Sequence, residues 1–388
     1  MDMYKVLETI AVPRPNHSDA LEKTSAYIQG LLASWDIPFT VQEFVLRPYQ
    51  QLLVGYACFF LSLLVILFVV RRKPLPILIA AIGIGALLFM EFEYFIPLVS
   101  PLITKTGQNI IVSFPAADAV RELVFAAHYD SKTDFFDHIE RAKLYRFIPI
   151  AGVLGMLMSL WVLLRKKFAS LGKPALSIAT VFLAGALSVY WGLVALGFGG
   201  YIFLSGQSCG AVDDGGSVVT LLALAKDIKE GRVKTGKSAV TIVFFAGEEV
   251  GPQGSRHFVK KYFGEDAAKR TVPASLVNLE LVGQNGNMLY WRKNGIFLSF
   301  LATDAGLRER LDAAWKGVSG KTMDAAGHIT DDALHFLRAG VPAITVGHTG
   351  LPGLGEGGFH DVTDCMDRVN TDNLYLMRTT LAKYIEGY

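Results

Sequence analysis

Two adjacent acids, Glu248 and Glu249, stand where a buried strand is expected to end. The run before them, residues 238–245, is rich in β-branched and aromatic residues, a composition typical of a strand. On an open α/β sheet, functional sites gather beyond the carboxyl ends of the strands. Neighbouring carboxylates repel one another, so a fold that keeps two together usually places a cation between them or gives them different roles. Taken alone, such a pair is most often a solvated acidic loop.

Four other short stretches place reactive side chains at expected strand or helix ends. Each is weak alone, because a single histidine is more often a surface or core residue and an Asp before a helix is usually a cap. Asp130, two residues after His128, is placed to orient that imidazole. The stretches are His128-Tyr129-Asp130, Gly210 to Gly216 with Asp213 at the start of a helix, Asn278-Leu279-Glu280, and Gly357-Gly358-Phe359-His360-Asp361.

Together the five stretches supply two imidazoles, three carboxylates suited to be ligands and one spare carboxylate. This donor set suits two zinc ions that share a bridging carboxylate. We find no Ser/His/Asp arrangement and no Gly-rich phosphate loop that competes as well. The motifs therefore favour zinc-dependent hydrolysis.

Alternating strand and helix patterns surround these motifs. Residues 206–388 alternate expected strands (238–245, 275–282, 341–347) with expected helices (215–226, 334–338), which predicts a mostly parallel sheet flanked by helices, an α/β fold. The earlier part adds expected strands at 39–45, 109–114 and 122–127. It also adds an expected helix at 20–32, with Ser18 as its N-cap.

Four long uncharged runs interrupt this pattern at residues 51–70, 75–95, 147–164 and 175–205, the second of them with Glu91 and Glu93 near its end. Clusters of Arg and Lys at 71–73 and 165–167 close two of them, as expected for transmembrane helices. The fourth run is long for one span, which favours a tilted helix or a continuation beyond the bilayer. Core helices of a soluble protein are the alternative, and four such runs disfavour it.

Composition limits the remaining classes. The 388 residues carry a net charge of +2, which gives no basic face for nucleic acid. Hydrophobic residues make up 52% of the chain, more than an ordinary soluble enzyme has. Three cysteines are too few for a disulfide framework or a Cys-rich zinc site. The first ten residues are mixed polar and charged, unlike a secretory leader.

These motifs, in this order, resemble the co-catalytic di-zinc aminopeptidase family, whose relatives include aminopeptidase Y, glutamate carboxypeptidase II and glutaminyl cyclase. The similarity extends to a membrane-embedded branch that includes endoplasmic reticulum metallopeptidase. It covers residues 1–48, 106–135 and 206–388 but none of the apolar runs. The matching motifs are His128 to Ser131, Gly210 to Gly216, Glu248 to Ser255, Asn278 to Gly283, Gly340 to Ala343 and Phe359 to Asp361.

The resemblance implies a role for each motif residue. Asp213 would bridge the two metals, His128 and Glu280 would complete one site, and Glu249 and His360 would complete the other. Glu248 would be the general base, and Asp130 would hold the ring of His128.

Two departures from the soluble members stand out. They have Asp where this chain has Glu280, although the membrane-bound branch resembles this chain there. They also need only a short loop between His128 and Asp213, where this chain inserts an apolar hairpin.

The expected domain organisation has five segments. Residues 1–48, 99–146 and 206–388 would form the peptidase domain, and 49–98 and 147–205 would form two transmembrane hairpins. Short basic loops remain in the cytoplasm, so the catalytic domain would lie on the extracytoplasmic or lumenal side of a four-span protein.

The expected function is that of a membrane-bound, zinc-dependent exopeptidase of the aminopeptidase type, with two Zn²⁺ per chain and peptide substrates. Glutaminyl cyclisation on the same scaffold and a non-catalytic membrane scaffold are the alternatives. The sequence leaves open the preferred side chain, the membrane and the oligomeric state.

Two local expectations accompany this interpretation. The family resemblance implies a cis peptide bond between Asp213 and Asp214. The spacing of Cys209 and Cys365 from Asp213 and His360 suggests that their sulfurs lie close, and both a disulfide and two free thiols fit that spacing.

Overall fold

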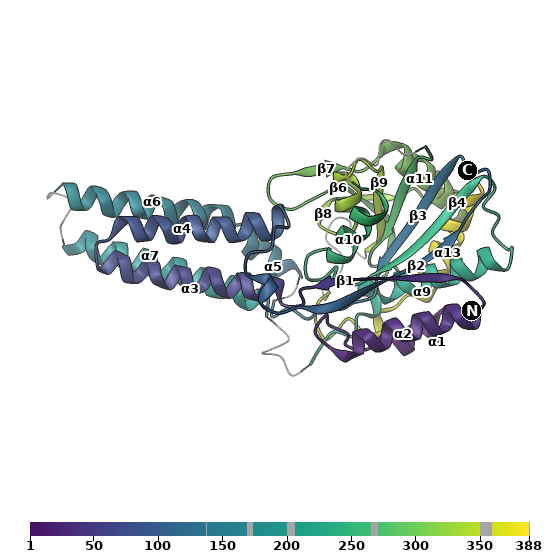
Figure 1. Cartoon of the computed structure of the whole chain (residues 1–388), viewed down its shortest axis with the longest axis horizontal. Helices are drawn as coiled ribbons and strands as arrows, with labels where there is room; N and C mark the ends of the chain where they lie inside the picture. Colours follow the sequence, from purple (N-terminus) through teal and green to yellow (C-terminus); the bar gives the residue numbers. More distant parts are fainter. Residues whose placement is uncertain (137, 169–173, 200–205, 265–270, 350–358, 388) are drawn as a thin grey trace. The chain divides into compact units, whose positions relative to one another are not determined.

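The computed structural model describes residues 1–136, 138–168, 174–199, 206–264, 271–349 and 359–387 (Figure 1). The chain divides into two compact units. The sheet unit comprises Met1–Pro48, Thr104–Thr133 and Gly206–Tyr388, and the helical unit comprises Tyr49–Ile103 and Asp134–Ser205. The helical unit is therefore made of two segments inserted into the chain of the sheet unit.

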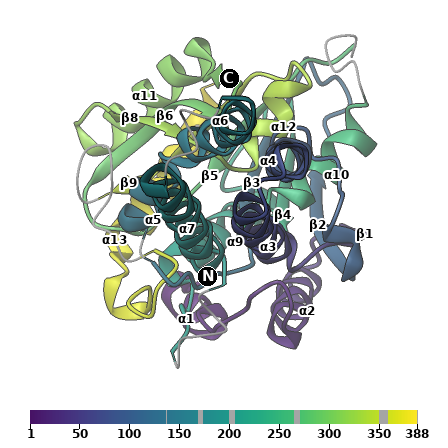
Figure 2. The same cartoon turned by 90° about the vertical axis from the view of Figure 1, so that its left-hand side faces the viewer.

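Four long helices form the helical unit, and Figure 2 views them end-on. Helix α3 packs against α4 and α7, and α4 packs against α6. Each of the four is long and apolar enough to cross a membrane. The unit contains α3 (Gln50–Val70), α4 (Pro74–Leu88) continued by the π-helix η1 (Phe89–Glu93), the short η2 (Ser100–Leu102), α5 (His138–Tyr145), α6 (Ile148–Lys167) and α7 (Pro174–Gly197).

The four apolar runs of the sequence thus form helices, as expected. The fourth run is not one continuous helix, because α7 ends at Gly197, and residues 200–205 lie outside the described part.

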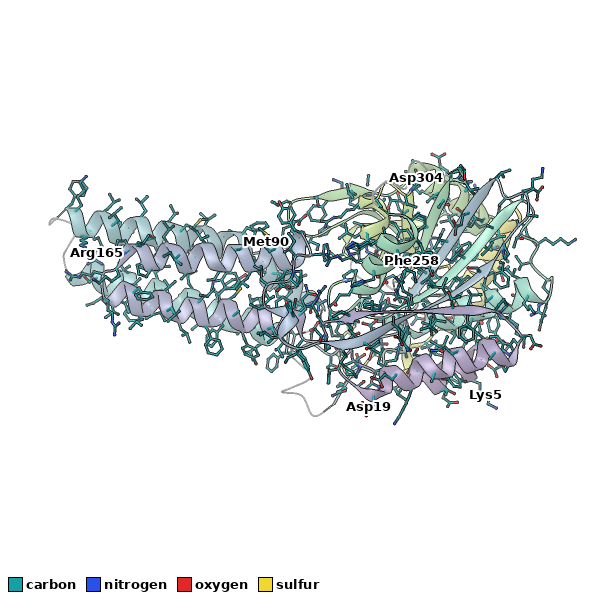
Figure 3. All side chains as sticks on the ribbon, viewed as in Figure 1. Lys5, Asp19, Met90, Arg165, Phe258 and Asp304 are labelled. Carbon is teal, nitrogen blue, oxygen red and sulfur yellow. The ribbon has the colours of Figure 1, made fainter. Side chains whose placement is uncertain are left out.

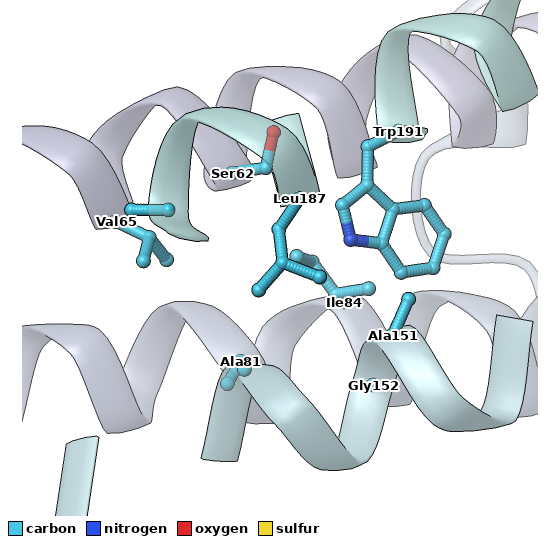
Figure 4. A pocket seen from close by; sticks show the side chains of 10 residues that line it. Ser62, Val65, Ala81, Ile84, Ala151, Gly152, Leu187 and Trp191 are labelled. Carbon is cyan, nitrogen blue, oxygen red and sulfur yellow. The ribbon is translucent and has the colours of Figure 1, made fainter. Parts of the chain in front are cut away.

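Apolar side chains cover the outside of the helical bundle. Leu75, Phe182 and Val189 are 64%, 74% and 64% exposed, and the sticks around the four helices in Figure 3 are mostly carbon. A pocket between the helices is lined by small residues, among them Ser62, Ala81 and Gly152, together with the larger Val65, Ile84, Leu187 and Trp191 (Figure 4). Large apolar groups outside and small residues at the helix contacts are typical of helices packed in lipid.

A mixed sheet is the centre of the sheet unit, with strand order β1-β2-β4-β3-β5-β9-β6-β7 and β8 paired to β6. Its central four strands, β4, β3, β5 and β9, are parallel. The β1–β2, β2–β4, β9–β6 and β6–β7 pairs are antiparallel. The bounds are β1 (Phe39–Leu46), β2 (Lys105–Phe114), β3 (Arg121–His128), β4 (Ser238–Phe245), β5 (Ala274–Leu279), β6 (Asn287–Gly295), β7 (Phe300–Ala302), β8 (Asp324–Ile329) and β9 (Ala343–Thr349).

Helices cover both faces of this sheet because its central strands alternate apolar side chains toward both. Leu123 and Phe125 of β3 join one apolar cluster with α1, α2, α9, α11 and α13, whereas Val124 joins another with α10 and α12. The helix bounds are α1 (Met3–Ile10), α2 (Asp19–Ser34), α9 (Gly216–Lys229), α10 (Gln253–Tyr262), α11 (Ala305–Ser319), α12 (Ala333–Arg338) and α13 (Thr371–Glu386). The fold is α/β with a central sheet flanked by helices, as expected from the sequence.

The sequence patterns located most of the strands but missed β6, β7 and β8. The expected strands at 39–45, 109–114, 122–127 and 238–245 all lie within observed strands, and the helix expected at 20–32 lies within α2, with Ser18 as its N-cap residue. The strand expected at 275–282 ends at Leu279 instead. The reason is local, because Leu281 has a φ of 59° and the chain turns away directly after Glu280. The sheet is parallel at its centre and in the β6–β8 pair, and its other pairs are antiparallel.

Gly216, at the start of α9, tests the packing behind Asp213. A Cβ there would lie 1.8 Å from the carbonyl oxygen of Val282, whereas one at Gly30 in α2 would meet nothing within 4 Å. We expect Gly216→Ala to destabilise the folded protein by roughly 1–3 kcal/mol or more. Gly30→Ala should be neutral or stabilising by up to about 1 kcal/mol. Thermal unfolding of the two purified variants checks this, and equal melting temperatures would contradict the close approach.

Candidate metal centre

The expected site residues gather at the carboxyl ends of adjacent strands. His128 is the last residue of β3, Glu248 and Glu249 follow β4, and Glu280 directly follows β5. Because β3 pairs in parallel with both β4 and β5, these three ends lie at one edge of the sheet. Asp213 lies in the kinked segment η4 (Ala211–Gly215) directly before α9, and its own backbone is non-helical.

One half of the centre is built around His128. Its Nε2 lies 3.2 Å from Oδ1 of Asp213 and 3.5 Å from Oε1 of Glu280. All three side chains are buried. The structure therefore brings together the three residues expected at the first metal.

The other half is built around His360. Its Nε2 lies 3.1 Å from Oδ2 of Asp213 and 2.9 Å from Oε2 of Glu249. His360 adopts a φ of 59°, a conformation uncommon for residues other than glycine. The two oxygens of Asp213 thus face two different histidine–glutamate pairs.

The donor atoms of this centre fit a metal. His128 Nε2, Asp213 Oδ1, Glu249 Oε1 and Glu280 Oε2 are buried and make no hydrogen bond. Buried polar atoms nearly always have a partner, so a converging set without one indicates a ligand. Imidazole nitrogens and carboxylate oxygens are zinc donors.

Glu248 lies beside this set. Its Oε2 is 4.0 Å from Nε2 of His128, farther than the carboxylates of Asp213 and Glu280, and its side chain is 10% exposed. Glu249 turns toward His360, so the two adjacent acids differ in their surroundings. The geometry leaves Glu248 available for a role other than metal binding.

Asp130 connects His128 to the turn that carries both acids. It is fully buried, and its Oδ1 lies 3.5 Å from Nδ1 of His128. Its two oxygens accept hydrogen bonds from the backbone N–H groups of Gly247, Glu248 and Glu249, at 3.1, 3.4 and 3.1 Å. Burial acts to raise the pKa of Asp130, but hydrogen bonds and the nearby imidazole outweigh it and lower that pKa.

Asp214 and Asp364 support the centre from behind, and the motif analysis missed both. Asp214 accepts hydrogen bonds from the N–H groups of His128 and Leu281, both at 3.2 Å. Asp364 accepts from the N–H groups of Val212 and Asp213, at 2.8 and 3.2 Å. In the sequence, Asp214 is marked only by its position next to Asp213, the expected bridging ligand. Asp364 lies 151 residues from Asp213, so no local pattern could reveal the contact.

Arg14 is a third residue that the motif analysis missed. It is fully buried, and its guanidinium donates to the carbonyl oxygens of Tyr129, Cys209 and Gly210 at 2.6, 2.7 and 2.8 Å. It thereby joins the segment after β3 to the segment before Asp213. An arginine in a loop between α1 and α2 gives no sequence signal for such a role.

The electrostatics of the centre call for a cation. Burial raises the pKa of Glu280 to about 8 against the opposing effect of His128. Burial likewise raises the pKa of Glu248 well above its ordinary value, and the charges of Glu280 and Glu249 add to that shift. Burial acts to raise the pKa of Asp213, but the two nearby imidazoles outweigh it and lower that pKa. A bound divalent cation would reduce the repulsion among these buried carboxylates.

Comparison with protein families gives a match over residues 193–385, to the model of peptidase family M28. Over those residues the chain is similar to peptidase family M28. The matched range contains Asp213, Glu248, Glu249, Glu280 and His360, and it begins after His128. No curated protein sequence matches the chain.

Solved structures show the same fold. A zinc-dependent exopeptidase from Parabacteroides distasonis is 16% identical, with a TM-score of 0.56, and the alignment covers 100% of this chain and 97% of that one. A leucine aminopeptidase precursor from Bacteroides thetaiotaomicron is 15% identical, with a TM-score of 0.54 and coverage of 100% and 96%. A glutaminyl cyclase from Tannerella forsythia is 17% identical, with a TM-score of 0.56 and coverage of 100% and 97%.

Two further expectations concerned the Asp213–Asp214 peptide bond and the cysteines Cys209 and Cys365. The Asp213–Asp214 peptide bond is cis, as expected from the family resemblance. The sulfurs of Cys209 and Cys365 are close together, at 2.8 Å, and both residues are free cysteines.

Asp364 provides a test of how the centre is held together. We expect Asp364→Asn to weaken zinc binding about 10–100-fold, because an amide NH₂ would face a backbone N–H that now donates to the carboxylate. Zinc titration of the purified protein measures this. Asp361→Asn is the matched control, since the hydrogen bonds that Asp361 accepts come from Thr363 of its own loop. Equal zinc affinities for the two variants would contradict the role of Asp364.

Proposed function

We propose that the chain is a membrane-anchored zinc exopeptidase of the aminopeptidase type. The observation that supports this best is Asp213, whose two carboxylate oxygens face two separate histidine–glutamate pairs. A carboxylate so placed suits two zinc ions held side by side. The match to a peptidase family supports the proposal that the chain hydrolyses peptide bonds.

In this proposal, His128, Glu280 and Asp213 would hold one ion, and Glu249, His360 and Asp213 would hold the other. Zinc bound there would polarise the scissile carbonyl and acidify a water. Asp130 keeps the His128 imidazole in position through its 3.5 Å contact with Nδ1.

Glu248 is the proposed general base. Its carboxylate lies at the edge of the centre and is not needed to complete either ligand set. It would accept a proton from the attacking water and return it to the amine of the departing peptide. The turn that carries Glu248 is fixed to Asp130, so the base and the oriented imidazole are positioned by one group.

The substrate would be a peptide that presents its chain end to the centre. The free α-amine of such a peptide would bind beside the second ligand set, Glu249 and His360. Glutaminyl cyclisation is the second candidate, because structures with this fold include glutaminyl cyclases. A scaffold without activity is disfavoured, since both ligand sets and the spare Glu248 are present.

The function is tested with a panel of aminoacyl and N-terminal glutaminyl peptides, assayed with and without a chelator. We expect the wild-type protein to release amino-terminal residues and to lose that activity when zinc is removed. Glu248→Gln should bind zinc like the wild type but lower the turnover number by about 10²–10⁴-fold, because it lacks the base. Asp213→Asn should instead lose zinc. Retained turnover in zinc-loaded Glu248→Gln would refute the assignment, and pyroglutamate as the sole product would favour the cyclase.

Membrane anchoring belongs to the same proposal. Residues 49–98 and 147–205 would form two hairpins that cross the bilayer, since their four helices are long and apolar enough. The peptidase domain would comprise 1–48, 99–146 and 206–388. The turn Arg71-Arg72-Lys73 and the basic cluster Arg165-Lys166-Lys167 at the end of α6 would face the cytoplasm. The peptidase domain would then be extracytoplasmic or lumenal.

Single cysteines placed at Lys166 and Lys321 test this orientation, in a background without the three native cysteines. Lys166 lies in the last turn of α6 and Lys321 lies in the sheet unit. In intact cells, a membrane-impermeant thiol reagent should label the cysteine at 321 and leave the one at 166 unlabelled until the membrane is opened. The reverse pattern would mean that the orientation is inverted.

A further inference from the structure

Cys209 and Cys365 meet beside the metal centre although 156 positions separate them in the chain. Their Sγ atoms are 2.8 Å apart, and both residues are half-buried free cysteines. A disulfide bond is about 2.05 Å long, so the sulfurs need to approach by only about 0.8 Å. Cys58, buried in the helical unit, is the third cysteine of the chain and has no such neighbour among the described cysteines.

The backbone around the two cysteines is already held in place. The carbonyl of Cys209 accepts a hydrogen bond from Arg14 at 2.7 Å. Asp364, the residue before Cys365, accepts from Val212 and Asp213 on the Cys209 side. The two segments are therefore joined by hydrogen bonds on either side of the thiol pair. Bond formation needs a small rotation of side chains and no rearrangement of loops.

Each cysteine lies close in sequence to a different ligand of the second half of the centre. Cys209 is four residues before Asp213, and Cys365 is five residues after His360. A bond between the two sulfurs would close a covalent ring through both ligand-bearing segments. His360 would then lose freedom to move away from Asp213 and Glu249.

We propose that Cys209 and Cys365 form a thiol pair whose oxidation to a disulfide locks His360 against Asp213 and slows the loss of zinc. This adds a covalent control of metal retention to the proposed function, and its chemical test does not depend on peptidase activity.

The oxidation is balanced by a disulfide-containing oxidant, such as oxidised glutathione. One cysteine, as the thiolate, attacks a sulfur of the oxidant, forms a mixed disulfide and releases one thiol. The second cysteine then attacks the first cysteine's sulfur, closes the Cys209–Cys365 bond and releases the second thiol. The chain loses two electrons and two protons, and one oxidant disulfide becomes two thiols. Reduced glutathione reverses both steps.

The first test measures the bond itself in the purified full-length chain. The protein is equilibrated with mixtures of oxidised and reduced glutathione, quenched in acid, alkylated and analysed as peptides by mass spectrometry. We expect the Cys209 and Cys365 thiols to disappear together, with one cross-linked peptide pair, while Cys58 stays alkylated. Free Cys209 and Cys365 at every glutathione ratio, or bonds only between molecules, would overturn the proposal.

The second test measures zinc release into a chelator, before and after oxidation of the same preparation. We expect the half-time of release to be several-fold longer for the oxidised wild-type protein. The double variant Cys209→Ser/Cys365→Ser should release zinc at one rate whatever the glutathione ratio, whereas Cys58→Ser should respond as the wild type does. A cross-linked wild-type protein that releases zinc no more slowly than the reduced one would overturn the lock.

Discussion

The centre depends above all on one buried carboxylate, that of Asp130. A carboxylate without partners is costly to bury, and this one receives three backbone N–H groups and the side-chain amide of Asn16. The same group faces Nδ1 of His128. The end of β3 and the turn after β4 are therefore fixed by a single anion. Any movement of that anion would displace an imidazole and two glutamates at once.

A second constraint is charge. The donors of the centre are mostly acids, and the buried cation nearby does not neutralise them. The guanidinium of Arg14 donates to the carbonyl oxygens of Tyr129, Cys209 and Gly210, so it joins loops and forms no ion pair with a ligand. The repulsion between Glu280, Asp213 and their neighbours is left for a metal to remove. Metal binding and the stability of this edge of the sheet should consequently be coupled.

How much of the centre can be predicted from the sequence depends on how far apart the interacting residues lie in the chain. The candidate ligands His128, Glu249 and Glu280 could be predicted because they stand at the ends of apolar strands that are recognisable from the local sequence. The supporting contacts were not, because Asp364 reaches Asp213 across 151 positions and Arg14 reaches Gly210 across 196. The antiparallel edges were also missed, since alternation in a strand does not reveal the direction of its neighbour. Local patterns thus predict which groups take part, and only the fold shows what holds them.

The two inserted segments show how a chain can carry long apolar helices and keep its centre. The first insert takes the place of a hairpin turn. Leu46 of β1 lies before it and Lys105 of β2 lies after it, and these two residues pair directly in the sheet. The second leaves after Thr133 and returns at Gly206, and there the N–H of Ser208 donates to Oγ1 of Thr133 at 2.9 Å. Both inserts are closed at their base by contacts within the sheet unit. Because the cost of closing a loop grows only slowly with its length, such inserts add little strain to the ligands on either side.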